Sequence, residues 1–179
     1  KTAVATELAY QYAHTGARSL LVDLDPQASA TNILGVSRNQ DLPTIFDLLG
    51  AIPPQLGEIR AAIRTAGPMW AGLECLSAER ALADTESDVT IGREMKVKRI
   101  LDQIEDTYDV MIIDCPPSLG MLTAHALAAA EQSLIVSEAR VESAQAISEV
   151  LTTIANVKTY YNPDLSVVGI VMNRRLKGR

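Results

Sequence analysis

Two acidic residues follow the first short apolar run of the sequence. Asp23 and Asp25 are separated by one residue, and Pro26 comes directly after them. Alternation along a strand places both carboxylates on the same side, and proline turns the chain away from the strand. Two carboxylates so close together repel each other unless a proton or a cation compensates them. The pattern indicates either a cation-binding pair or acids that cap the turn and the next helix.

A third acidic residue, Asp114, follows an apolar run at residues 110–113. This is the Walker B pattern, in which an aspartate at the end of a buried strand holds the water shell of Mg²⁺. Short apolar runs that end in aspartate are common, so the pattern alone has low specificity. Pro116 and Pro117 sharpen it, because two prolines impose a stiff, extended loop after the acid.

A lysine and a threonine open the sequence, directly before a helical pattern. Lys1 and Thr2 match the last two positions of the phosphate-binding sequence G-x-x-x-x-G-K-[ST], whose first six positions the sequence does not contain. In that loop the lysine reaches the β- and γ-phosphate oxygens, and the hydroxyl binds Mg²⁺. The match of Lys1 and Thr2 to this motif becomes more specific in context, because the paired acids and then the Walker B pattern follow in the expected order.

The elements that must position these residues alternate between helices and strands. Helical patterns cover residues 2–14, 45–49, 56–64, 78–84, 93–106, 119–130 and 143–161, and apolar runs indicate strands at 19–24, 73–76, 110–113, 133–136 and 167–172. Strands joined by helices need right-handed crossovers, which predicts an α/β fold with a mainly parallel sheet and helices on both faces. Ligands bind at the carboxyl ends of such strands, where the acids lie.

The composition agrees with this fold and limits the function classes. The chain has 179 residues, of which 47% are hydrophobic, 21% charged and only 4% aromatic, as expected for one domain over residues 1–179 with an aliphatic core. No apolar run approaches the roughly 20 residues that cross a bilayer, which predicts a cytoplasmic protein. The net charge of -6 lacks the basic excess of a self-sufficient nucleic-acid-binding module. Cys75 and Cys115 lie far apart and are expected to be buried free thiols.

Taken together, these segments resemble the ParA/MinD family of deviant Walker-type ATPases, and within it the ParA (Soj-like) chromosome and plasmid partition ATPases. Residues 1–9 look like the end of the deviant Walker A motif and its helix. Residues 21–31 are similar to the switch I segment of the family, and residues 109–120 resemble its Walker B motif and switch II. The string Asp-x-Asp-Pro-Gln is the most specific, because it separates partition ATPases from most other P-loop proteins.

The resemblance implies roles for five residues and the cofactors ATP and Mg²⁺. Lys1 would bind phosphate and Thr2 would ligate Mg²⁺, while Asp114 would hold the metal ion through water. Asp25 would position the attacking water, and Asp23 would support that catalytic network. The fold implied is P-loop NTPase-like with its first strand missing, so residues 1–179 would be a single, incomplete ATPase domain.

Two features at the end of the sequence add to the implied site. Asn173 ends the last predicted strand, where the family uses an asparagine to contact adenine. Four basic residues follow on an otherwise acidic chain, at Arg174, Arg175, Lys177 and Arg179. Such a patch could bind DNA through its phosphates without sequence specificity, or it could be a solvated loop after a strand.

The implied function is ATP-dependent DNA partition. ATP would bring two subunits together as a homodimer, and the dimer would bind DNA non-specifically and associate with the nucleoid. A ParB-like centromere-binding partner would stimulate the hydrolysis of ATP to ADP and phosphate. Because most of the Walker A motif, the signature lysine and the C-terminal helices of the family are absent from the sequence, we expect the 179 residues alone to be inactive.

Three other functions are weighed against partition. A MinD-like membrane-cycling ATPase would need a C-terminal amphipathic helix, which the sequence does not contain, and the Asp-Pro-Gln string argues against it. An iron-sulphur carrier ATPase would want a C-x-x-C pair, which Cys75 and Cys115 do not supply. A metabolic P-loop enzyme, such as an amide-forming synthetase, would need a pocket for a small-molecule acid that the sequence does not reveal.

Overall fold

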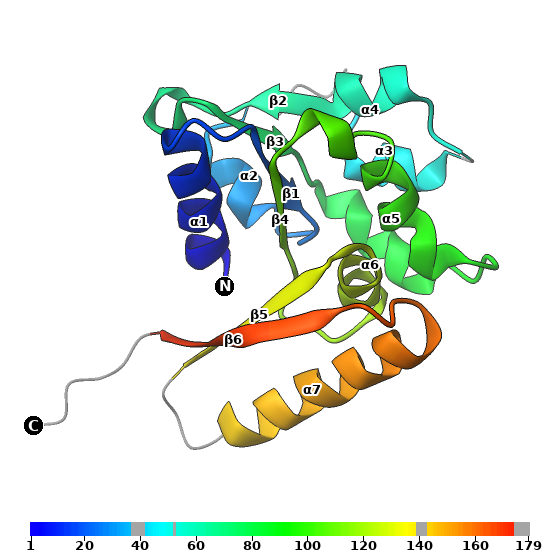
Figure 1. The fold of residues 1–179 in the computed structure, drawn as a ribbon. Helices are drawn as coiled ribbons and strands as arrows, with labels where there is room; N and C mark the ends of the chain where they lie inside the picture. The colour runs from blue at the N-terminus through cyan, green and yellow to red at the C-terminus, as the bar shows by residue number, and fades with distance from the viewer. Residues whose placement is uncertain (37–41, 52, 139–142, 174–179) are drawn as a thin grey trace, which may run out of the picture.

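The computed structural model is an α/β structure in which one strand of the main sheet lies between two parallel neighbours (Figure 1). It describes residues 1–36, 42–51, 53–138 and 143–173. Strand β1 (Ser19–Asp23) pairs in parallel with β3 (Leu73–Leu76) on one side and with β4 (Val110–Asp114) on the other. A short strand, β2 (Ile63–Thr65), pairs antiparallel with β3 at the edge of this sheet.

The two remaining strands of the described residues form a second sheet. Strand β5 (Gln132–Glu138) pairs in parallel with β6 (Ser166–Asn173), and the long helix α7 (Ser143–Tyr160) connects them. Figure 1 shows this pair and α7 below the main sheet. The prediction of an α/β fold with mainly parallel strands is therefore confirmed.

Strand β1 is buried on both faces, as its unbroken apolar sequence requires. Leu20 and Val22 point to a core shared with the helices on one face of the sheet. Leu21 points the other way, into a second core with Ala9 of α1 (Thr2–His14). Because all five residues of β1 are buried, the acidic residue at its end is carried by the most enclosed strand of the main sheet.

The helices cover both faces of the main sheet. Helix α1 ends near Gly16, whose φ of +93° lies in the left-handed region that terminates helices. The other α-helices are α2 (Ser29–Ile33), α3 (Ile45–Gly50), α4 (Leu56–Ala62), α5 (Lys96–Leu101) and α6 (Met121–Ala129). Short 3-10 helices lie at η1 (Pro68–Trp70), η2 (Arg80–Ser87), η3 (Arg93–Met95) and η4 (Glu105–Thr107).

The structure departs from the predicted helices in three places. The helix predicted over 93–106 is divided into η3, α5 and η4, and a turn at Ile104 lets that side chain enter the core at 2% exposure. The helix predicted over 56–64 stops at Ala62, since Ile63 pairs with Leu76 of β3 instead. The helix predicted over 78–84 is the 3-10 helix η2.

Helix α6 carries a histidine in the core. His125 is fully buried, and neither ring nitrogen has a hydrogen-bond partner among the described residues. Burial lowers the pKa of His125, and the nearby Lys96 lowers it further, while the acidic residues Glu94, Asp88 and Glu86 act in the opposite direction. The imidazole is therefore held in its neutral form.

Among the residues that the structure describes, no helix combines the length and hydropathy of a membrane span.

Candidate functional site

The carboxyl ends of β1 and β4 bring two buried acids together. Asp23 and Asp114 are register partners across the parallel pair, and the amide of Leu24 donates to the carbonyl of Asp114 at 2.9 Å. Asp23 is 0% exposed and Asp114 is 2% exposed. The apolar runs before each acid form the strands, and the pairing of those strands brings the acids side by side.

Asp23 is satisfied by hydrogen bonds from its own loop. The amide and the hydroxyl of Thr31 both donate to Asp23 Oδ2 at 2.8 Å, and the amide of Asp25 donates to Oδ1 at 3.1 Å. The Thr31 hydroxyl also accepts from the amide of Ala78 at 3.1 Å. Burial raises the pKa of Asp23, and the hydrogen bonds from Thr31 oppose that rise. Asp23 therefore organises the loop that carries Asp25.

Asp25 stands at the start of a tight turn. The amide of Gln27 donates to Asp25 Oδ1 at 2.9 Å, and the amide of Ala28 donates to the Asp25 carbonyl at 2.7 Å. Ala28 closes the turn with a φ of +52°, in the left-handed region that non-glycine residues rarely adopt. Asp25 is 8% exposed. Its carboxylate is thus held by the turn at the wall of a cleft.

Asp114 carries a buried oxygen with no partner. Oδ2 of Asp114 accepts no hydrogen bond from the described residues. Burial raises the pKa of Asp114 to about 6, the Thr2 hydroxyl opposes this rise, and Asp23 and Asp25 add to it. A buried, unpartnered carboxylate oxygen is costly unless a cation or a donor approaches it. The arrangement is therefore suited to a cation.

One cleft gathers most of the residues singled out in the sequence. It has a volume of about 550 Å³. Lys1, Thr2, Asp25 and Asn173 all line it, and Asp114 lies directly before the lining residue Cys115. The other lining residues are Ala3, Ser29, Ile33, Pro117, Val136, Ser137 and Glu138. The basic residues Arg174, Arg175, Lys177 and Arg179 lie outside the described residues.

Residues of this cleft fit Mg²⁺ bound together with phosphate groups. Within the described ranges, no cluster of three or more His, Cys, Asp or Glu side chains could hold a metal ion. Mg²⁺ commonly uses one or two protein ligands and completes its octahedron with phosphate oxygens and water. The orphan oxygen of Asp114 and the nearby Thr2 hydroxyl supply an oxygen donor set of that kind.

Sequence reasoning missed the contribution of β5 to the cleft. Val136, Ser137 and Glu138 line it from the carboxyl end of that strand. The rule that ligands bind at the carboxyl ends of parallel strands would have found them. Cys115 also lines the cleft. Both it and Cys75 are free thiols, as predicted, but only Cys75 is buried as expected, while Cys115 is intermediate in exposure. Burial raises the pKa of Cys115 to about 12, so its thiol stays protonated.

Parallel strand ends that carry carboxylates, beside a helix that begins with Lys-Thr, define an α/β protein of the P-loop class. A family model described as an AAA domain matches residues 1–167. Sporulation initiation inhibitor protein Soj of Bacillus subtilis is 33% identical over 174 residues, covering 96% of this chain and 66% of Soj. Chromosome partitioning protein ParA of Myxococcus xanthus is 36% identical over 173 residues, covering 96% of this chain and 59% of ParA. The chain belongs to the ParA/MinD-type ATPase family.

A solved structure shares the fold of this chain. Cobyrinic acid a,c-diamide synthase from Mycobacterium smegmatis, with bound ATP analogue and magnesium, has a TM-score of 0.84 and is 32% identical. The match covers 97% of this chain and 71% of that chain. By contrast, this chain spans less than two thirds of the length of the curated relatives Soj and ParA, at 66% and 59%.

Proposed function

We propose that this chain is the nucleotide-binding part of an ATP-dependent DNA partition protein that binds ATP with Mg²⁺ and hydrolyses it to ADP and phosphate. The observation that carries the proposal is the unpartnered, buried oxygen of Asp114, which directly precedes Cys115, a residue of the cleft that Lys1 and Thr2 also line. A relative named as a chromosome partitioning protein, 36% identical, supports the choice of process.

The residues of the cleft divide the work between binding and hydrolysis. Lys1 would hold phosphate oxygens, and the Thr2 hydroxyl and Asp114 would hold Mg²⁺, Asp114 through water. Bound Mg²⁺ neutralises charge on the phosphate groups. Asp25 would orient the attacking water, because its turn holds the carboxylate at the cleft wall. Asp23 would keep that turn in place through Thr31.

Base recognition would take place at Asn173. Asn173 lies at the end of β6 and lines the same cleft as Lys1. A side-chain amide both donates and accepts hydrogen bonds, which suits the edge of adenine. We assign Asn173 to that contact.

Hydrolysis would act as a switch for assembly. ATP would bring two copies together, the dimer would bind DNA non-specifically at the nucleoid, and a ParB-like partner would stimulate hydrolysis and release. The loop of Asp25 and the loop after Asp114 are the segments whose order would change with the nucleotide, as in other P-loop switches. The basic residues Arg174, Arg175, Lys177 and Arg179 are the candidate contacts to DNA phosphates.

The test of this function is co-sedimentation of the intact protein with DNA, with and without ATP. Binding to DNA should require ATP, and Asp25→Ala should keep ATP binding while turnover is lost. The exposed Asp164→Ala serves as the matched control and should behave like the unchanged protein. DNA binding that is indifferent to nucleotide, or normal turnover in Asp25→Ala, would contradict the proposal.

The likeness to cobyrinic acid a,c-diamide synthase favours one second candidate, an enzyme that uses ATP to form an amide. Such an enzyme would consume ATP only when a carboxylic acid and a nitrogen donor are present. Hydrolysis that depends on those substrates and ignores DNA would favour the synthase over partition.

A further inference from the structure

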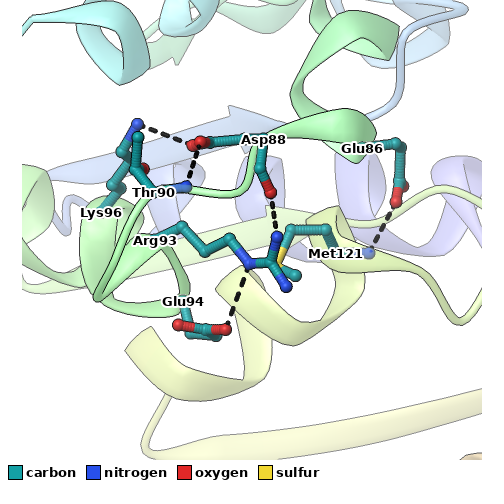
Figure 2. Close-up of polar contacts among 7 residues, drawn as sticks. All are labelled: Glu86, Asp88, Thr90, Arg93, Glu94, Lys96 and Met121. Atoms are coloured by element: carbon teal, nitrogen blue, oxygen red, sulfur yellow. Dashed lines mark hydrogen bonds and ion pairs between the residues drawn. The ribbon is translucent and has the colours of Figure 1, made fainter.

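The segment between Asp114 and α6 is attached at its far end to a remote acidic residue. The amide of Met121, the first residue of α6, donates to Glu86 Oε2 at 2.7 Å. Gly120 caps the helix and has no side chain that could accept this bond. A carboxylate at a helix N-terminus satisfies a free N–H and complements the helix dipole. Glu86 of η2 therefore supplies the cap that the local sequence lacks (Figure 2).

Gly120 is what allows the carboxylate to come so close. A Cβ atom at this position would lie 2.4 Å from Glu86 Oε2 and 2.8 Å from its Cδ. The backbone of Gly120, with φ -81° and ψ -160°, is one that alanine adopts without strain. An alanine there would thus displace the Glu86 side chain and leave the local backbone intact.

The segment that carries Glu86 is itself braced. Asp88 forms an ion pair with Lys96 at 2.8 Å and accepts from the amide of Thr90 at 2.8 Å. Arg93 donates to the Asp88 carbonyl and pairs with Glu94 at 3.3 Å. Figure 2 shows this network beside the start of α6. The segment directly after Glu86 is therefore held in place by these contacts.

The segment from Asp114 to Gly120 connects the N-terminus of α6 to the cleft. Pro116 and Pro117 stiffen the path between Asp114 and Gly120, and Thr123 of α6 donates to the carbonyl of Ser118 at 2.7 Å. A shift of the α6 N-terminus would pass along this short path to Asp114 and to the lining residue Pro117.

We infer that Glu86 is a positioning residue for the metal-binding side of the cleft, acting through the Met121 amide and the close approach at Gly120. The inference rests on the proposed nucleotide function. Glu86 touches neither nucleotide nor metal ion in this scheme, and its effect is confined to where Asp114 stands.

The test combines variants at the two ends of the contact. In the intact protein, Glu86→Ala and Gly120→Ala should each raise the Mg²⁺ concentration for half-maximal ATP hydrolysis by about three- to tenfold, the range expected for loss of a helix cap. Nucleotide binding without Mg²⁺ should stay unchanged. The double variant should be no worse than either single one, because both remove the same contact. Glu86→Gln, which retains an acceptor, should fall between Glu86→Ala and the unchanged protein.

Asp84→Ala, an exposed acid on the same η2 helix, is the matched control and should not change the Mg²⁺ requirement. Amide hydrogen exchange at Met121 gives a readout without nucleotide, and it should accelerate about three- to tenfold in Glu86→Ala and Gly120→Ala alike. The inference would be overturned if the effects of the two single variants on the Mg²⁺ requirement multiplied in the double variant. It would also be overturned if Glu86→Ala had the same Mg²⁺ requirement as Asp84→Ala. If ATP does not bind the unchanged protein, the proposed function fails and the inference with it, whereas ATP binding with an unaltered Mg²⁺ requirement in Glu86→Ala overturns the inference alone.

Discussion

The two sides of the cleft are built on very different strands. All five residues of β1 are buried, and the strand carries Asp23 at its end. Five of the eight residues of β6, which carries Asn173, are exposed. Asp23 therefore ends a strand that is enclosed between two cores, and Asn173 ends a strand that is largely exposed.

Under the proposed function, this difference matches the separate demands of catalysis and of base recognition. A metal ion and an attacking water require geometry held to fractions of an ångström. The hydrogen bonds of Asp23 to Thr31 and Asp25 provide that rigidity from the core outwards. Contact with a base tolerates more movement. The first three of the four predictions that follow test the contrast, and they begin with the largest effect.

Truncating one apolar residue on β1 and one on β6 should give unequal losses in the free energy of unfolding. Leu21→Ala, at a residue that is 0% exposed, should lower the free energy of unfolding by about 2–5 kcal/mol. Ile170→Ala on β6, at 47% exposure, should cost about 1 kcal/mol or less. Urea unfolding of both variants measures the difference. Equal losses would remove the basis for the contrast.

Asp114→Asn should lower the affinity for Mg²⁺ and raise the free energy of unfolding. A buried carboxylate whose pKa is raised to about 6 binds more protons folded than unfolded, so it costs stability as pH rises from 3.8 towards 6 and above. Removing the charge should stabilise the nucleotide-free protein at pH 7 by about 1–3 kcal/mol. Mg²⁺ affinity in the presence of ATP should fall by about 10- to 100-fold.

Urea unfolding at pH 5 and pH 8 and Mg²⁺ titration of ATP hydrolysis measure both effects of Asp114→Asn. Asp102→Asn, at an exposed acidic residue after α5, is the control and should change neither quantity beyond a few tenths of a kcal/mol. A loss of stability in Asp114→Asn would mean that the carboxylate is compensated within the fold.

Asn173→Ala should affect only base recognition. Loss of one or two hydrogen bonds to adenine should weaken ATP binding by about three- to tenfold. Discrimination between ATP and GTP should fall, and the rate at saturating ATP should remain unchanged. Competition binding with both nucleotides measures this. A lower rate at saturation would place Asn173 in the catalytic part of the cleft instead.

His125 should make the protein sensitive to mild acid. Its pKa is lowered in the fold, so the unfolded chain takes up a proton first as pH falls through about 6.5. Stability should therefore decline below that pH, by at most about 1.4 kcal/mol per pH unit from this group. His125→Leu should flatten the decline, and the exposed His14→Gln should not. An unchanged pH slope in His125→Leu would show that other groups cause it.

The strands and the cleft residues were largely predictable from sequence, because they depend on local patterns. An apolar run that ends in an acid predicts both the strand and the position of the acid, as at Asp23 and Asp114. Parallel pairing then places these strand ends together. Lys1, Thr2, Asp25 and Asn173 followed from the family resemblance, and the structure brings them to one cleft.

What could not be predicted depends on contacts between distant segments. Strand β2 exists because Ile63 and Thr65 pair with β3, although Ile63 continues a helical pattern in the sequence. The contact of Glu86 with Met121 joins residues 35 positions apart and matches no motif. The orphan oxygen of Asp114 depends on burial, which strand pairing and helix packing create.

Ala28 adopts a left-handed backbone conformation, which places conformational strain in the turn after Asp25. A non-glycine residue in that region costs roughly 1–3 kcal/mol, and the surrounding hydrogen bonds of Asp23 and Asp25 must overcome it. A glycine would adopt the same backbone without strain but would give the unfolded chain more freedom. A substitution at position 28 would therefore change how stiff the loop that carries Asp25 is and how easily it moves.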